Sequence, residues 1–294
     1  MAVVTKNGEE RRGAAEMIGR RTALAAALGL AAGCAAPARP APPAPPGTPP
    51  GPTGTPPAAR PPAQPTREQV LARYADQSPH AWGTDLPGVR ATVPDGALAL
   101  TFDACGGPGG DGYDAALIGI LRRLRVPATL FLNARWVDAN PGPAGELAAD
   151  PLFEIGNHGT AHRPLSVTGR PAYGITGTAD PAAAYDEVAG NRAKLTALLG
   201  GRAPGWFRSG TAHYDEVALR LVGELGERVA GFAVNADGGA TFTPAQVAGE
   251  VAAAPPGSVL ISHFNHPAAG TAEGYARALP ALLDAGRRFV RLSD

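Results

Sequence analysis

The chain has little of several residue types, and each shortage excludes a class of protein. Only two of its 294 residues are cysteine, Cys34 and Cys105, so it cannot be a small scaffold held together by many disulfides. Lysine plus arginine and aspartate plus glutamate number 26 each, which gives a formal net charge of zero. Without a basic patch or interleaved aromatic residues, nucleic acid is not an expected partner. The apolar run at residues 22–34 is too short to span a bilayer as a helix.

That apolar run has the features of an export signal. Arg20 and Arg21 precede it, and it ends at Gly33 and Cys34, which is the usual order of basic, apolar and small residues. We expect residues 1–34 to be a lipoprotein-like signal, with Met17 as an alternative start and Cys34 as the lipidated residue. The paired arginines leave general secretory and twin-arginine export both open. The competing interpretation is a chance apolar helix with a buried cysteine.

Three further segments follow the signal. Residues 35–66 hold 14 of the 31 prolines and predict an extended, disordered linker. Residues 67–96 form a lead-in that begins with a short helix, because Thr66 and Gln69 have the spacing of a capping box. Residues 97–294 are enough for one catalytic-size domain. We therefore expect an exported, extracytoplasmic monomer, tethered to the bacterial cell membrane through a lipid on Cys34.

Strands and helices alternate from residue 97 onward. The apolar patterns predict helices at residues 114–124, 182–199, 214–227, 244–254 and 271–285. They predict strands at residues 97–104, 127–133, 153–157, 206–209, 229–235, 257–263 and 288–292. About seven strands alternating with helices predict the α/β class, as an imperfect parallel (β/α)7-type barrel.

Acid–base residues stand where three of the apolar segments end. Asp103 follows residues 98–102, His158 and His162 follow residues 153–157, and His263 ends the run that begins at residue 259. The carboxyl ends of parallel strands meet at one rim, so these side chains should lie together. One carboxylate, a His-x-x-x-His pair and a third histidine are the parts of a hydrolytic metal site. Arg208 is a candidate partner for Asp103, because a buried carboxylate needs one.

The order of these segments resembles that of a known family. Thr-Phe-Asp at 101–103, His-Gly-Thr-Ala-His at 158–162, Phe-Arg-Ser-Gly at 207–210 and Ile-Ser-His at 261–263 resemble the motifs of the polysaccharide deacetylase family, the NodB-homology domain of carbohydrate esterase family four. The resemblance covers residues 97–294. It implies a barrel of that kind and a metal-dependent hydrolase that removes N-acetyl, or else O-acetyl, groups from cell-wall or surface polysaccharide. The implied partner is an N-acetylated glycan or peptidoglycan.

The resemblance also implies a role for each motif residue. The implied cofactor is a divalent metal, with zinc first and cobalt, nickel or manganese as alternatives. Its ligands would be two histidines, and a base and an acid would act beside it. In this sequence these are His158 and His162 as ligands, Asp103 as general base, Arg208 as its ion-pair partner, His263 as general acid, Asp237 as the partner of His263, and the backbone at Thr211 as an oxyanion donor.

One position departs from the family. Ala104 stands where the family has a second, metal-binding aspartate. Cys105 is the adjacent candidate replacement because thiolate suits zinc, and the alternative is that it is a buried small apolar residue; Asp111, Asp114 and Asn157 stay open as further replacements. Two other functions also stay open. One is a non-catalytic glycan-binding lipoprotein that has kept the barrel and lost its metal, and the other is a hydrolase of a different carbon–nitrogen bond or of an ester.

Overall fold

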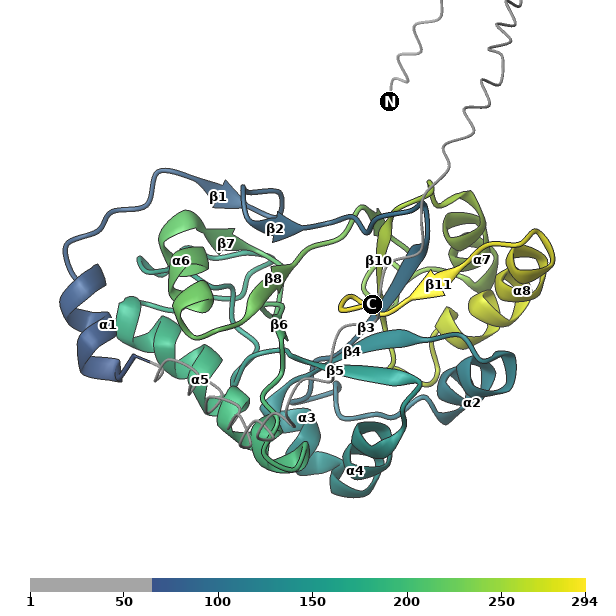
Figure 1. Cartoon of the computed structure of the whole chain (residues 1–294), viewed down its shortest axis with the longest axis horizontal. Coiled ribbons are helices and arrows are strands. Elements are labelled where there is room, and N and C mark those ends of the chain that lie inside the picture. The colour runs from purple at the N-terminus through teal and green to yellow at the C-terminus, as the bar shows by residue number, and fades with distance from the viewer. Residues whose placement is uncertain (1–64) are drawn as a thin grey trace, which may run out of the picture. The chain divides into compact units, whose positions relative to one another are not determined.

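The computed structural model describes residues 65–294, in which helices surround a curled sheet (Figure 1). The predicted export signal, Cys34 and residues 35–64 of the predicted linker lie outside the described residues, so they stay predictions. Within residues 65–294 no helix is both long and apolar enough to cross a membrane.

The large sheet is parallel throughout. Its order is β2 (Val89–Arg90), β8 (Arg228–Ala230), β6 (Trp206–Phe207), β5 (Phe153–Asn157), β4 (Ala128–Leu132), β3 (Leu98–Ala104), β10 (Val259–His263) and β9 (Val234–Asn235). A short strand, β11 (Phe289–Val290), also pairs with β3. Two further strands, β1 (Trp82–Gly83) and β7 (Tyr214–Asp215), form a separate antiparallel pair.

The chain that follows β2 closes the gap between the two arms of the sheet. The N–H of Gly231, just after β8, donates to the carbonyl of Arg90 at 2.8 Å. On the other side, the N–H of Val259 in β10 donates to Ala91 at 3.0 Å. A single short segment thus touches both β8 and β10. The sheet is a curled, incomplete barrel, which confirms the predicted fold class.

Helices cover the outside of this barrel. They are α1 (Arg67–Tyr74), α2 (Ala115–Leu124), α3 (Ala134–Ala139), α4 (Pro141–Ala149), α5 (Pro181–Leu198), α6 (Glu216–Glu224), α7 (Pro244–Ala253) and α8 (Thr271–Asp284). In Figure 1, α1, α5 and α6 lie on one side of the sheet and α7 and α8 on the other. The predicted capping box is present, because the Thr66 and Gln69 side chains each accept from the other's backbone N–H.

Side chains along β3 alternate between two environments. Leu98, Leu100, Phe102 and Ala104 belong to the apolar cluster shared with the helices α2 and α8. Ala99 belongs to a second cluster, which fills the barrel interior. Because side chains alternate along a strand, Thr101 and Asp103 share the inner face with Ala99. This alternation places Asp103 inside the barrel and Ala104 on its helix-covered outside.

Two predicted elements were wrong in extent. The predicted strand at 229–235 is two strands at opposite ends of the sheet, because the chain leaves the sheet after Ala230; β8 pairs with β2 and β6, whereas β9 pairs with β10. The predicted helix at 214–227 begins only at Glu216. Residues 214 and 215 pair with β1 instead, and the Asp215 side chain caps α6 by accepting from Ala218 N–H at 2.7 Å. Helices α3 and α4 were not predicted.

Candidate active site

The carboxyl ends of four strands bring the predicted site residues together. Asp103 on β3 and His263 on β10 are register partners, so they lie side by side on neighbouring strands. Asn157, the last residue of β5, pairs with Phe207 of β6, and His158 and Arg208 follow them directly. The polar residues therefore gather at one rim because parallel strands end there together.

Asp103 and Arg208 form a buried ion pair. Arg208 Nη1 donates to Asp103 Oδ1 at 2.8 Å and to Thr101 Oγ1 at 2.8 Å, and neither Arg208 nor Asp103 is more than 2% exposed. The guanidinium also lies over the Phe131 ring, 4.4 Å from its centroid. Burial raises the pKa of Asp103, but Arg208, with His158 and His263, outweighs burial and holds that pKa below its usual range. Asp103 is thus kept as a carboxylate.

Cys105, His158 and His162 form a cluster with the donors of a metal site. One ligand atom from each residue lies within 4.8 Å of the others, and Cys105 Sγ is 3.8 Å from His158 Nε2. His158 Nδ1 lies 2.9 Å from the carbonyl oxygen of Arg208; an N–H donated there leaves the Nε2 lone pair free to bind a cation. His162 Nε2 is buried and has no hydrogen-bond partner within residues 65–294.

This donor set fits zinc. Thiolate and imidazole are the ligands that zinc takes most often in proteins, and an unpartnered buried imidazole nitrogen is otherwise costly. Burial raises the pKa of the Cys105 thiol, but His162 above all, then His158 and His263, outweigh burial and hold that pKa well below its usual range. Cys105 is thereby favoured in the thiolate form that binds metals.

The other replacement ligands considered for Ala104 are engaged elsewhere. Asp111 Oδ1 accepts from the Gly107 N–H at 2.7 Å. Asp114 caps α2, and Asn157 Oδ1 accepts from the Gly159 N–H at 3.0 Å and from Asn191 Nδ2 at 2.8 Å. Ala104 itself lies in the outer apolar cluster. Among the described residues, Cys105 is the candidate placed beside the two histidines.

His263 is paired with Asp237 at the edge of the same site. The His263 Nδ1 and Asp237 Oδ1 atoms lie 3.0 Å apart, and Asp237 Oδ2 accepts from the His263 N–H at 2.7 Å and from Thr271 Oγ1 at 3.1 Å. Burial lowers the pKa of His263, but Asp237 and, after it, Cys105 outweigh burial and hold that pKa well above its usual range. The protonated form of His263 is therefore favoured.

An open cleft of about 310 Å³ lies over these groups, and its lining includes Asp103, His263 and Thr211. The backbone N–H of Thr211 has no hydrogen-bond partner within the described part of the chain. A free N–H on the wall of the cleft is what an oxyanion donor requires.

Two buried residues that the sequence reasoning missed hold the histidine loop in shape. The Glu187 carboxylate, from α5, accepts the N–H groups of Ala161 at 2.9 Å and of Arg163 at 3.1 Å. Asn133, after β4, donates to the carbonyls of His158 at 2.9 Å and Gly159 at 2.8 Å. Asn133 ends a predicted strand, which could have placed it at the rim. Nothing in the pattern of the helix at 181–198 sets Glu187 apart.

His162 itself has a left-handed backbone, with φ of +61°, so the loop needs such support. Gly210 is the close neighbour that makes room for it. A Cβ added at Gly210 would lie 2.4 Å from the carbonyl carbon of His162. Only glycine fits at that position without moving the metal-binding loop.

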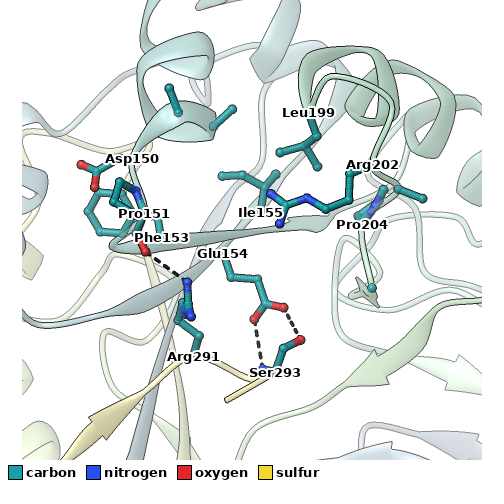
Figure 2. A pocket seen from close by; sticks show the side chains of 14 residues that line it. Asp150, Pro151, Phe153, Glu154, Ile155, Leu199, Arg202, Pro204, Arg291 and Ser293 are labelled. Carbon is teal, nitrogen blue, oxygen red and sulfur yellow. Dashed lines mark hydrogen bonds between the residues drawn. The ribbon is translucent and has the colours of Figure 1, made fainter. Parts of the chain in front are cut away.

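A second pocket, of about 520 Å³, lies at the amino end of the barrel, where β5 begins (Figure 2). Two of its polar groups are already paired. Glu154 binds Ser293, and Arg291 Nη1 donates to the carbonyl of Pro151 at 3.1 Å. The amino ends of barrel strands serve stability, whereas the carboxyl ends carry chemistry, so we assign the active site to the smaller cleft.

Comparison with known proteins agrees with the fold. Residues 90–230 match the model of the polysaccharide deacetylase family. The uncharacterized protein SCO4760 of Streptomyces coelicolor is 30% identical over 221 residues, which are 72% of this chain and 78% of that protein. The chain belongs to the polysaccharide deacetylase family. This family comprises hydrolases that act on carbon–nitrogen bonds, and its carbohydrate esterase family four members are generally metal-dependent.

Solved structures show the same fold. BA3943 of Bacillus anthracis is described as a family four pseudoenzyme, and one of its mutants as having restored enzymatic activity. The structure of that mutant has a TM-score of 0.57, with 20% identity over 68% of this chain and 67% of that one. The Bc1960 peptidoglycan N-acetylglucosamine deacetylase also has a TM-score of 0.57, with 20% identity over 69% of this chain and 89% of that one. The fold thus occurs in both an active deacetylase and a pseudoenzyme.

Proposed function

We propose that the protein is a metal-dependent deacetylase that hydrolyses N-acetyl groups of a cell-wall glycan. One observation carries the proposal: the donors of Cys105, His158 and His162 gather within 4.8 Å, with Asp103 beside them. This arrangement supports a metal site that has kept its function by replacing the lost carboxylate with a thiolate.

The base of the proposed reaction is Asp103. A bound divalent cation would supply a Lewis acid that polarises the acetyl carbonyl. Arg208 holds Asp103 Oδ1 at 2.8 Å, and Asp103 Oδ2 lies 3.6 Å from His158 Nε2, beside the metal donors. In this position Asp103 accepts the proton of the water that attacks the carbonyl carbon.

The acid of the reaction is His263. Attack makes a tetrahedral carbon whose oxyanion the Thr211 N–H can receive. His263 then donates its Nε2 proton to the amide nitrogen, and the carbon–nitrogen bond breaks to give acetate and a free amine on the sugar. Asp237 holds His263 at 3.0 Å and keeps it in the orientation and protonation state for this transfer.

The proposed location is the outer face of the bacterial membrane. The predicted signal and Cys34 support a lipid tether, and the proline-rich residues 35–66 would let the domain reach the wall. Detergent partitioning of wild type against Cys34→Ala tests the tether. Recovery of both proteins in the aqueous phase would contradict it.

Acetate release from N-acetylglucosamine oligomers and from peptidoglycan tests the reaction. The protein is measured as purified, after chelation, and after zinc, cobalt, nickel or manganese is added back. We expect release that chelation removes and a metal restores, and that Asp103→Asn reduces strongly. Glycan binding without acetate release by any metal form would instead support the alternative of a non-catalytic glycan-binding lipoprotein. A pseudoenzyme with this fold is known.

A further inference from the structure

An exposed tyrosine stands on the wall of the active-site cleft. Tyr173 lines the cleft together with Asp103 and His263, yet its side chain is 81% exposed. Among the described residues, the other exposed large hydrophobic side chain is Ile175 at 37%. An aromatic ring left open to solvent beside a reaction centre is a feature of ligand-binding grooves.

The backbone at Tyr173 has a conformation that a bulky side chain disfavours. Tyr173 and Gly174 have φ values of +50° and +76° and form the tip of a two-residue hairpin turn. Ala172 and Ile175 close this turn with reciprocal backbone hydrogen bonds of 3.1 and 2.9 Å. Asparagine or glycine is preferred at the first tip position, whereas a bulky residue there is disfavoured. Such conformations occur often at functional sites, and this one lies at the cleft, which favours a function for the ring.

A set of rings holds the tyrosine in place. The Tyr173 and His213 ring centroids are 5.2 Å apart at an interplanar angle of 89°, and His213 lies 5.8 Å from Trp82. His213 Nδ1 lies 2.8 Å from the carbonyl oxygen of Thr211, so the rings are linked to the segment that carries the oxyanion donor. Because Tyr173 and His213 meet edge to face, they do not cover each other as stacked rings would.

We propose that Tyr173, supported by His213, is a stacking platform for a pyranose ring of the glycan, next to the sugar whose acetamide lies between Asp103 and His263. A pyranose presents an apolar face of C–H groups that can bury against an aromatic ring, while its hydroxyls stay in water. This proposal rests on the proposed function. It adds that the enzyme uses a neighbouring sugar of the glycan for binding, through Tyr173.

Binding to the catalytically disabled Asp103→Asn protein tests the platform without turnover. The probe is the N-acetylglucosamine pentamer, measured by titration calorimetry. Tyr173→Asn removes the ring but suits the left-handed turn, so the hairpin should be kept and the melting temperature should hold or rise. We expect the pentamer to bind on the order of tenfold more weakly, the size of one lost aromatic contact. Tyr173→Phe should bind within about twofold of the parent, since the ring remains.

Ile175→Ala is the matched control, because Ile175 is exposed on the same hairpin and does not line the cleft. It should leave pentamer binding unchanged. Equal binding by the parent and Tyr173→Asn, or no binding by either, would overturn the platform. Normal acetate release by Tyr173→Asn at every oligomer length would leave the deacetylase proposal standing and refute only the platform. Pentamer binding that depends on Tyr173, without acetate release by the wild type, would refute the deacetylase proposal and leave the platform standing.

Discussion

Glu187→Gln is the substitution that tests most sharply how the metal-binding loop is held. Two backbone N–H groups donate to the Glu187 carboxylate: that of Ala161 is shared between Oε2 at 2.9 Å and Oε1 at 3.1 Å, and that of Arg163 donates to Oε1 at 3.1 Å. Glutamine keeps one acceptor oxygen and replaces the other with an NH₂ group, which cannot accept from Ala161. Losing one branch of this shared hydrogen bond, together with the charge of the acceptor, should cost about 0.5–1.5 kcal/mol of stability.

Part of this cost should appear in metal affinity. His162 lies between the two anchored residues, in a left-handed backbone that the anchors hold. Losing a residue that orients a metal ligand typically lowers affinity about 10- to 100-fold. We therefore expect Glu187→Gln to weaken zinc binding by about that factor and to lower the melting temperature by about 2–4 °C for each kcal/mol lost. Competition with a chromogenic chelator and thermal unfolding measure the two effects.

Glu154→Gln is the control at the opposite end of the barrel. Glu154 accepts from Thr129 at 2.9 Å and from the Ser293 N–H at 3.2 Å, far along the strands from the histidines. It should lower stability and leave zinc affinity unchanged. Wild-type zinc affinity in a destabilised Glu187→Gln protein would refute our account of the loop.

Three further predictions concern charge and pH. Asp103→Asn should lower turnover by about 10²–10⁴-fold. The wild-type rate should fall at low pH as Asp103 is protonated and at high pH as His263 loses its proton. Because the pKa of Asp103 is lowered and that of His263 is raised, the pH–rate profile should show a broad plateau between these limits. Ala104→Asp should not restore a metal ligand, and it should lower the free energy of unfolding by several kcal/mol, because the carboxylate would enter the outer apolar cluster. Denaturant unfolding measures this loss, and tighter zinc binding by the variant would contradict the prediction. Burial raises the pKa of Glu227 to about 8, so the stabilising contribution of its protonated form is present below pH ~4.5 and is lost as pH rises to about 8. Glu227→Gln should therefore make the melting temperature less dependent on pH between those limits. An unchanged slope of melting temperature against pH would count against the prediction.

The sequence was most informative where pattern and chemistry coincide. Apolar segments such as residues 128–132 became the observed strands, because a strand buried on both faces needs a nearly continuous apolar run. Residues at the ends of those strands, such as Asp103 and His263, could be expected at one rim for a purely topological reason.

The residues that prediction missed act through tertiary contacts. Glu187 lies in the middle of α5 and reaches a loop more than twenty residues earlier in the chain, which no local pattern can show. The break between β8 and β9 was missed because residues 229–235 are largely apolar throughout, so the exit of the chain after Ala230 leaves no polar signal. The outward direction of Ala104 follows only once the register of β3 is known.

The central claim is that Cys105 takes the place of the missing carboxylate and binds the metal with His158 and His162. Cobalt substitution tests it most directly, because thiolate bound to cobalt gives an intense charge-transfer absorption in the near ultraviolet that oxygen and nitrogen ligands lack. We predict this absorption, with one cobalt bound per chain, in wild type and in Cys34→Ala, and its loss in Cys105→Ala together with a loss of zinc affinity. Stoichiometric cobalt without the thiolate absorption in wild type, or a Cys105→Ala protein that binds zinc as tightly as wild type, would contradict the account.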